Sequence, residues 1–281
     1  MDPQIFVINL INNNSRMKNI LNELNKVNLC DNIIRINAID AKKAYKLRHQ
    51  YFTQDVEDNI NNLKSTITIP TWGAAGCAIS HINTWRYIYK NKINLALIFE
   101  DDTEISNTDD FNYCYNLAKN IYKNKIQNST DNFKPFFFSF LSYTSSPIYK
   151  FENRNMFDFS SDSFFIGTSC YMVNYDFCLF MNNQLMPITN QIDVELAKYL
   201  NSNKYNYNKR DIYLFNKKSG IIQSKKFNSN VQFYFINLEE LIWALYSMPK
   251  EIVKIIFGYL PRKENIQDYY YNYFYNFKYL S

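Results

Sequence analysis

The chain has 281 residues, 47% of them hydrophobic, which is enough for one large α/β domain or for a domain with a small appendage. Its 31 basic and 26 acidic residues leave a net charge of +5, and the basic runs are scattered pairs such as Lys42-Lys43. A nucleic-acid-binding protein usually concentrates its basic residues on one helix or stripe, so this pattern argues against that class of protein.

The cysteines are odd in number, widely spaced and free of any C-x-x-C pair: Cys30, Cys77, Cys114, Cys170 and Cys178. Because the chain has only two histidines, we do not expect a zinc cage, and we interpret the thiols as buried and reduced. The first residues lack the architecture of a signal peptide, and no apolar run is long enough to span a bilayer. These features predict a cytoplasmic protein without a transmembrane segment.

The chain opens with a pattern typical of a β-α-β unit. An apolar run over residues 5–10 predicts a buried central strand, apolar residues at helical spacing over 17–29 predict a helix, and residues 33–36 predict a second strand. Such a unit favours a parallel sheet with a right-handed crossover.

The next segment leads to another buried strand. Residues 41–69 are polar and weakly periodic, which predicts short helices and a loop. A helix is expected from about residue 74 to residue 90, and the small residues at its start allow it to approach a neighbour closely. Residues 95–99 predict a central strand that ends in three carboxylates.

The α/β pattern continues to about residue 230. The further predicted elements are a helix over about 109–125, strands at 136–140 and 164–173, a helix capped by Asn174, a helix opening at 192–196, and short strands at 212–215 and 221–223. Gly167, inside the second of these strands, allows a bulge or a close backbone approach.

The C-terminal tail differs in character from the rest of the chain. Residues 231–281 are rich in aromatic residues and contain two amphipathic helical patterns separated by Pro249. We interpret them as a helical appendage to a domain formed by residues 1–230. Residues 248–261 faintly resemble the start of an F-box, but a helical hairpin docked on the sheet is the preferred interpretation.

The three carboxylates Glu100, Asp101 and Asp102 pose an electrostatic problem at the end of a buried strand. Like charges a few ångströms apart repel, and burial raises the free energy of each ionised group. A divalent cation such as Mg²⁺ or Mn²⁺ relieves both penalties and leaves coordination places for phosphate oxygens. Ligands of open α/β sheets bind beyond the carboxyl ends of the strands, where this triplet lies. The alternative is that these acids merely cap a turn.

Several short segments of the sequence occur in an order that resembles glycosyltransferase family 25, the lipooligosaccharide and collagen β-galactosyltransferase group. They cover roughly residues 4–230. They are Phe6-Val7-Ile8-Asn9-Leu10 with Arg16, Ala38-Ile39-Asp40, Gly76-Cys77-Ala78-Ile79-Ser80-His81 with Trp85, Ala96-Leu97-Ile98-Phe99-Glu100-Asp101-Asp102, Gly167-Thr168-Ser169-Cys170-Tyr171, Pro187 with Ile192-Asp193, and Gln223.

This resemblance implies a GT-A fold, which is a Rossmann-like mixed sheet flanked by helices, here with the C-terminal helical appendage. It also implies an inverting transfer of a hexose, galactose or glucose, from a UDP-sugar. The expected cofactor is Mn²⁺ or Mg²⁺, which neutralises the departing diphosphate. The expected acceptor is a glycan or a hydroxylysine of a collagen-like protein.

The resemblance also implies roles for individual residues. Asp102 is the first choice as metal ligand, and Glu100 and Asp101 share metal, ribose or sugar contacts. Asp193 matches the acidic position that serves as the base for the acceptor hydroxyl, or as a ligand of a sugar hydroxyl. Its alternative interpretation is an aspartate at a helix N-terminus.

The donor-binding set implied by the resemblance comprises Asn9, Arg16, Asp40, Ser80, His81 and Gln223. The first three follow the first two strands, where the nucleoside is expected, although Arg16 also fits a plain surface arginine. His81 is expected to contact the donor or to orient the carboxylates, and its alternative is a packed, hydrogen-bonded histidine. Gln223 is also a candidate for the metal shell.

Two departures from the family pattern leave other functions open. Ala75 stands where an acidic residue commonly precedes the Gly-Cys pair, and no histidine follows His81 to complete a metal shell. An inert module that binds a nucleotide sugar or a glycan is therefore one alternative, and a protein that recruits a partner through its tail is another. The composition is similar to that of proteins of large DNA viruses, which also suits a cytoplasmic location.

Overall fold

The structure is a computed structural model, and it describes residues 2–62, 68–127, 134–141, 143–144, 149–151, 154–158, 165–201, 212–215 and 219–224. All of them belong to the first of two compact units, residues 1–232, and the second unit is formed by residues 233–281. The helical appendage predicted at 231–281 and its F-box-like segment lie outside the described residues and stay predictions.

Within the described residues, the main sheet contains eight strands and is mixed. In spatial order these are β2 (Ile33–Asn37), β1 (Gln4–Asn9), β3 (Leu95–Glu100), β10 (Cys170–Asn174), β5 (Phe137–Ser139), β11 (Ile212–Phe215), β8 (Arg154–Asp158) and β7 (Tyr149–Phe151). Strand β1 pairs in parallel with both β2 and β3, as the β-α-β pattern predicts. Two smaller sheets pair β4 (Thr103–Ile105) with β12 (Ile221–Gln223), and β6 (Tyr143–Thr144) with β9 (Phe165–Ile166).

Strand β10 runs antiparallel to its neighbours β3 and β5 in the middle of the sheet. Its first residue, Cys170, pairs with Phe99 near the end of β3. The loop that enters β10 therefore lies beside the carboxyl end of β3, and the amide of Glu100 donates to the carbonyl of Ser169 at 2.8 Å.

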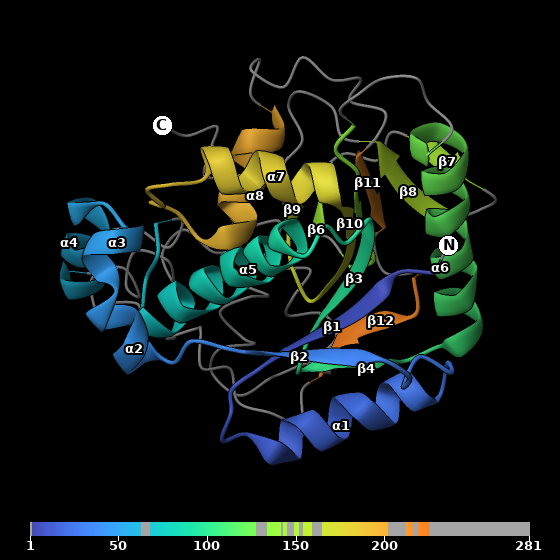
Figure 1. Ribbon diagram of the computed structural model, residues 1–281, viewed down its shortest axis with the longest axis horizontal. Coiled ribbons are helices and arrows are strands. Elements are labelled where there is room, and N and C mark those ends of the chain that lie inside the picture. The colour runs from blue at the N-terminus through green and yellow to red at the C-terminus, as the bar shows by residue number, and fades with distance from the viewer. Residues whose placement is uncertain are drawn as a thin grey trace, which may run out of the picture. The chain divides into compact units, whose positions relative to one another are not determined.

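Apolar cores lie on both faces of the sheet because successive side chains of a strand point to opposite faces. Phe6 and Ile8 of β1 belong to one core, and Ile5 and Val7 belong to the other. The first core is covered by α5 and α7, and the second by α1 and α6 (Figure 1). Burial on both faces explains why these strands are continuously apolar in sequence.

The helices that surround the sheet have bounds close to those expected from the sequence. They are α1 (Asn14–Asn25), α2 (Ala41–Lys46), α3 (Arg48–Tyr51), α4 (Gln54–Asn62), α5 (Trp72–Lys90), α6 (Thr108–Ile121), which continues as a π-helix over Tyr122–Gln127, α7 (Tyr175–Gln184) and α8 (Ile192–Asn201). None of the helices in the described part of the chain is long and apolar enough to cross a membrane.

The structure confirms the mixed α/β sheet flanked by helices and corrects the prediction in several places. Asn174 caps α7 as predicted, with its side chain accepting from the amide of Phe177. The single strand predicted at 164–173 is instead two strands, β9 and β10, because the chain turns at Gly167, where φ is 115°. The cysteines are all free, but Cys30 and Cys77 are partly exposed, so full burial is wrong for these two.

The start of α5 approaches the loop after β2 closely, as its small residues predict. A Cβ atom added to Gly76 would lie 2.2 Å from the carbonyl oxygen of Ile39. One turn later, the Ser80 hydroxyl accepts from the amide of Ile39 at 2.8 Å and donates to the carbonyl of Gly76 at 2.6 Å. Gly76 and Ser80 therefore fix α5 against the β2–α2 loop.

We expect Gly76→Ala to lower the free energy of unfolding by about 1–3 kcal/mol, because the methyl group forces the helix away from the Ile39 carbonyl. Denaturant unfolding measures this change. Lys90→Ala, at an exposed position of the same helix, is the control and should change stability by about 0.5 kcal/mol or less. Equal stability of Gly76→Ala and the unmodified chain would contradict this close approach.

Candidate active site

The three carboxylates predicted to form the site lie at the carboxyl end of β3. Glu100 is the last residue of that strand, and Asp101 and Asp102 form the turn into β4. Asp101 and Asp102 are buried, with exposed fractions of 7% and 8%. Their negative charges are therefore concentrated in a poorly solvated space.

Asp101 is anchored to the end of β1 and to the first turn of α1. Its Oδ2 accepts from Asn9 Nδ2 at 2.6 Å, and its Oδ1 forms an ion pair with Arg16 Nη1 at 3.0 Å. Burial raises the pKa of Asp101 above its ordinary value, although Asn9 and Arg16 both oppose that rise. Because both of its oxygens already contact donors of the protein, we assign Asp101 a structural role in the triplet.

Arg35 fixes the orientation of the amide that binds Asp101. Its Nη2 donates to Asn9 Oδ1 and to the carbonyls of Leu10 and Ile11, the latter two at 3.0 Å. With its oxygen turned to a guanidinium, the Asn9 side chain presents its amide hydrogens to Asp101. The motifs do not include Arg35, although a lone arginine between the isoleucines of β2 is an unusual residue for a strand and could have indicated a role.

Asp102 has one oxygen that remains without a hydrogen-bond partner among the described residues. This atom, Oδ1, is buried, whereas Oδ2 accepts from Gln223 Nε2 at 3.1 Å. Burial, together with the charge of Glu100, raises the pKa of Asp102 to about 6. A buried carboxylate oxygen without a donor fits a site that a cation completes.

Glu100 is held by two side chains from different elements. Its Oε1 accepts from Thr168 Oγ1 at 2.8 Å and is 3.2 Å from His81 Nε2. Burial opposes its ionisation, but the hydrogen bond and charge of His81, with the Thr168 hydroxyl, bring the pKa of Glu100 below its ordinary value. Glu100 is therefore ionised at neutral pH.

A buried chain of hydrogen bonds orients His81. Trp85 Nε1 donates to the Tyr171 hydroxyl at 2.9 Å, and the same hydroxyl is 2.8 Å from His81 Nδ1. Since ionised Glu100 can only accept, Nε2 of His81 carries a hydrogen, and in the neutral ring Nδ1 then accepts from Tyr171. Trp85 and Tyr171 belong to segments of the predicted motif, but sequence alone did not assign them this positioning role.

Asp193 lies in the first turn of α8 and is linked to the loop before β10. Its Oδ2 accepts from the amide of Gly167 at 3.1 Å, and its Oδ1 accepts from the amide of Val194 at 2.9 Å. Burial and the charge of Glu100 raise the pKa of Asp193, against the effect of these two amides. Because the charges of Asp193 and Glu100 interact, the structure places Asp193 in the electrostatic field of the triplet.

The structure brings together most of the residues predicted for the donor site. Asn9 and Arg16 contact Asp101, His81 contacts Glu100, and Gln223 contacts Asp102. Ser80 binds two backbone groups, and exposed Asp40 caps α2 by accepting from the amide of Lys43. No hydrogen bond or ion pair connects these last two side chains to the triplet among the described residues.

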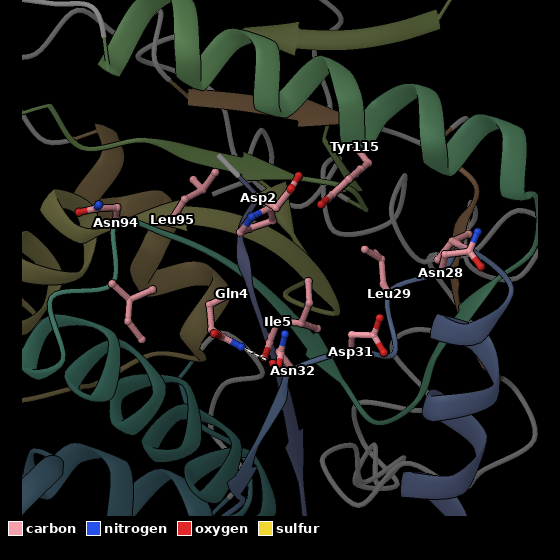
Figure 2. A pocket seen from close by; sticks show the side chains of 13 residues that line it. Asp2, Gln4, Ile5, Asn28, Leu29, Asp31, Asn32, Asn94, Leu95 and Tyr115 are labelled. Carbon is pink, nitrogen blue, oxygen red and sulfur yellow. Dashed lines mark hydrogen bonds between the residues drawn. The ribbon is translucent and has the colours of Figure 1, made fainter.

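A separate hollow of about 650 Å³ lies at the other end of the strands, away from the carboxylate triplet (Figure 2). It is lined by residues from the amino ends of β1 and β3, including Gln4, Ile5 and Leu95, and Gln4 donates to the carbonyl of Asn32. None of the predicted site residues lines it. Since ligands of open α/β sheets bind at the carboxyl ends of the strands, we do not assign it to the active site.

Asp102→Asn is expected to stabilise the metal-free protein at pH 7. With its pKa raised from 3.8 to about 6, folded Asp102 holds its proton more tightly than the unfolded chain does. That contribution to stability is complete below about pH 4 and is lost as the pH rises through about 6. The oxygen of a neutral asparagine can still accept from Gln223, and its side chain does not ionise as the pH rises. We therefore expect the free energy of unfolding at pH 7 to increase by roughly 2 kcal/mol.

Denaturant unfolding with a chelator present, at pH 7 and at pH 4, measures this effect. The gain should shrink at pH 4, where Asp102 is protonated. Asp109→Asn, at an exposed position in the first turn of α6, serves as the control and should show no such pH-dependent gain. If Asp102→Asn destabilises the metal-free protein at pH 7, burial does not raise the free energy of the ionised Asp102 side chain.

Comparison with known proteins identifies the family. A family model described as glycosyltransferase family 25 (LPS biosynthesis protein) matches residues 2–196. This span is more than half of the chain and includes the carboxylate triplet and Asp193, whereas Gln223 lies beyond it.

The comparison with curated proteins gave no match. The mixed sheet flanked by helices is consistent with the GT-A fold, whose enzymes typically use a divalent metal. The chain therefore belongs to glycosyltransferase family 25 and is a glycosyltransferase.

Proposed function

We propose that this glycosyltransferase is metal-dependent and inverting, and that it moves a hexose, galactose or glucose, from a UDP-sugar to an acceptor hydroxyl. The observation that carries the proposal is the buried Asp102 Oδ1, which has no hydrogen-bond partner among the described residues. It lies two residues from Glu100, which His81 and Thr168 keep ionised. An ionised carboxylate close to a buried carboxylate oxygen that has no hydrogen-bond donor among the described residues fits a hard divalent cation such as Mn²⁺ or Mg²⁺.

The three carboxylates have different roles in binding that cation. Asp102 and Glu100 would bind it, and Asp101 orients the turn through Asn9 and Arg16. When bound, the cation supplies positive charge that stabilises the diphosphate leaving group. Gln223 donates to Asp102 Oδ2 and so directs the other oxygen, Oδ1, toward the cation.

Asp193 is the residue we propose as the base for the acceptor hydroxyl. Its pKa is raised by burial and by Glu100, which makes the carboxylate a better proton acceptor than an ordinary aspartate. The amides of Gly167 and Val194 hold both oxygens in place, so the side chain is oriented before the acceptor arrives.

The substrates are proposed from membership of the family. Asn9 at the end of β1, Arg16 in α1 and Asp40 in the loop after β2 would receive the nucleoside of the donor. The acceptor would be a glycan or a hydroxylysine of a collagen-like protein, and the reaction would take place in the cytoplasm.

A panel of UDP-sugars tests the proposal directly. We expect release of UDP from UDP-galactose or UDP-glucose in the presence of Mn²⁺ or Mg²⁺, and loss of that release when a chelator is added. A glycan acceptor and a hydroxylysine-containing peptide are compared in parallel. No release from any donor, together with no metal-dependent shift of the melting temperature, would overturn the proposal.

Asp193→Asn tests whether Asp193 acts as the catalytic base or as a ligand of the donor. We expect kcat to fall by about 10²- to 10⁴-fold with little change in donor binding, because the variant cannot take a proton. Steady-state kinetics and donor binding by calorimetry give the two quantities. Asp55→Asn is the matched control, since Asp55 is likewise in the first turn of a helix but is exposed. If Asp193→Asn weakens donor binding as much as it lowers kcat, Asp193 is a substrate ligand and not the base.

A further inference from the structure

A thiol, an imidazole and a carboxylate lie close together where α5 approaches Glu100 of the triplet. Cys77 and His81 lie one turn apart on α5, at positions i and i+4 of the same helix face, and Glu100 ends β3. One ligand atom from each of the three side chains lies within 4.8 Å of the other two. The His81 Nε2 and Glu100 Oε1 atoms are already 3.2 Å apart.

Their combination of ligand atoms differs from that of the proposed Mn²⁺ or Mg²⁺ site. A thiolate, an imidazole and a carboxylate form a set that suits Zn²⁺, whereas Mg²⁺ and Mn²⁺ prefer oxygen ligands. From zinc bond lengths, ligand atoms around one tetrahedral ion are about 3.3–3.8 Å apart. The 3.2 Å distance between His81 Nε2 and Glu100 Oε1 nearly fits this range. The sulfur of Cys77 has to move by roughly an ångström at most.

The surroundings of His81 also fit a metal ligand. A metal-bound histidine usually makes a hydrogen bond with its second ring nitrogen, which fixes the ring. In this chain that nitrogen is Nδ1, which is 2.8 Å from the Tyr171 hydroxyl, and Trp85 holds the hydroxyl in turn. Nε2 therefore already faces Glu100 in a fixed orientation.

Charge and access favour a cation at the same place. The Cys77 thiol lies in the electrostatic field of the carboxylates of Glu100, Asp193, Asp102 and Asp101, so the whole site is negative. That field attracts a divalent ion. Cys77 is partly exposed, which gives the ion a route from solvent.

We propose that Cys77, His81 and Glu100 form a second metal site, which takes a thiophilic divalent ion of the Zn²⁺ type. Binding forms bonds from the ion to Sγ, Nε2 and a carboxylate oxygen. The thiol proton leaves to solvent, and the neutral His81 ring exchanges its Nε2 hydrogen for one on Nδ1, next to the Tyr171 hydroxyl. The site has three protein ligands and a place for water, unlike the four-ligand cage that the sequence argued against. One consequence rests on the proposed function: since Glu100 belongs to both sites, Zn²⁺ and the catalytic cation compete for it, and Zn²⁺ inhibits transfer.

The binding claim is tested on the full-length protein without any sugar. Co²⁺ serves as a coloured substitute for Zn²⁺, and a thiolate-to-cobalt charge-transfer band reports Cys77 directly. Zn²⁺ affinity is then measured by competition with a chromogenic chelator, under a reductant that contains no thiol. We expect one tight Zn²⁺ in the unmodified chain and an affinity about 100-fold weaker or more in Cys77→Ser.

Cys30→Ser is the matched control, because Cys30 is also free and partly exposed but lies after α1, away from the triplet. It should retain both the cobalt band and the Zn²⁺ affinity. Absence of the band, or equal Zn²⁺ affinity in Cys77→Ser and the unmodified chain, would overturn the second site. The proposed function has a separate readout, the Mn²⁺-dependent release of UDP, so either claim can fail while the other stands.

Discussion

Three consecutive carboxylates at the end of β3, two of them buried and the third partly buried, are the constraint around which this end of the molecule is organised. Each ionised group loses hydration and repels the other two, so each needs a compensating partner. Glu100 obtains donors from α5 and from the loop before β10, and Asp101 obtains a guanidinium and an amide from the first 16 residues. Among the described residues, the Asp102 carboxylate obtains a side-chain donor from Gln223 alone, and its pKa is raised to about 6 by burial and by the charge of Glu100.

The direction of β10 makes these compensations possible. A parallel strand at that position would end beside Glu100, whereas antiparallel β10 begins there and is preceded by a tight loop. That loop carries the Thr168 hydroxyl to Glu100 and the Gly167 amide to Asp193. Tyr171, one residue into β10, then reaches His81. One reversal of strand direction thus joins the proposed metal-binding and base residues in a single network.

Much of this architecture was predictable from sequence, for identifiable reasons. Strands β1 and β3 are buried on both faces and are therefore continuously apolar, and Asn174 has the side chain that a helix cap requires. The break between β9 and β10 falls at Gly167, Thr168 and Ser169, which separate two apolar runs. It was missed because a glycine inside a strand pattern is also compatible with a bulge, and the positive φ of Gly167 is not visible in the sequence. The roles of Arg35 and Thr168 depend on neighbours up to 68 residues away, which local patterns do not reveal.

The different fates of the three carboxylates follow from the elements that each one contacts. Glu100 ends β3, and the turn after it brings Asp101 and Asp102 to different neighbours. Asp101 is held by Asn9 at the end of β1 and by Arg16 in α1, and Asp102 by Gln223 in β12. The Asn9–Arg16–Arg35 network holds Asp101, and the charge of Arg16 also acts on Glu100 and Asp102. By fixing the middle residue of the three, this network helps to leave Glu100 and Asp102 available for a cation.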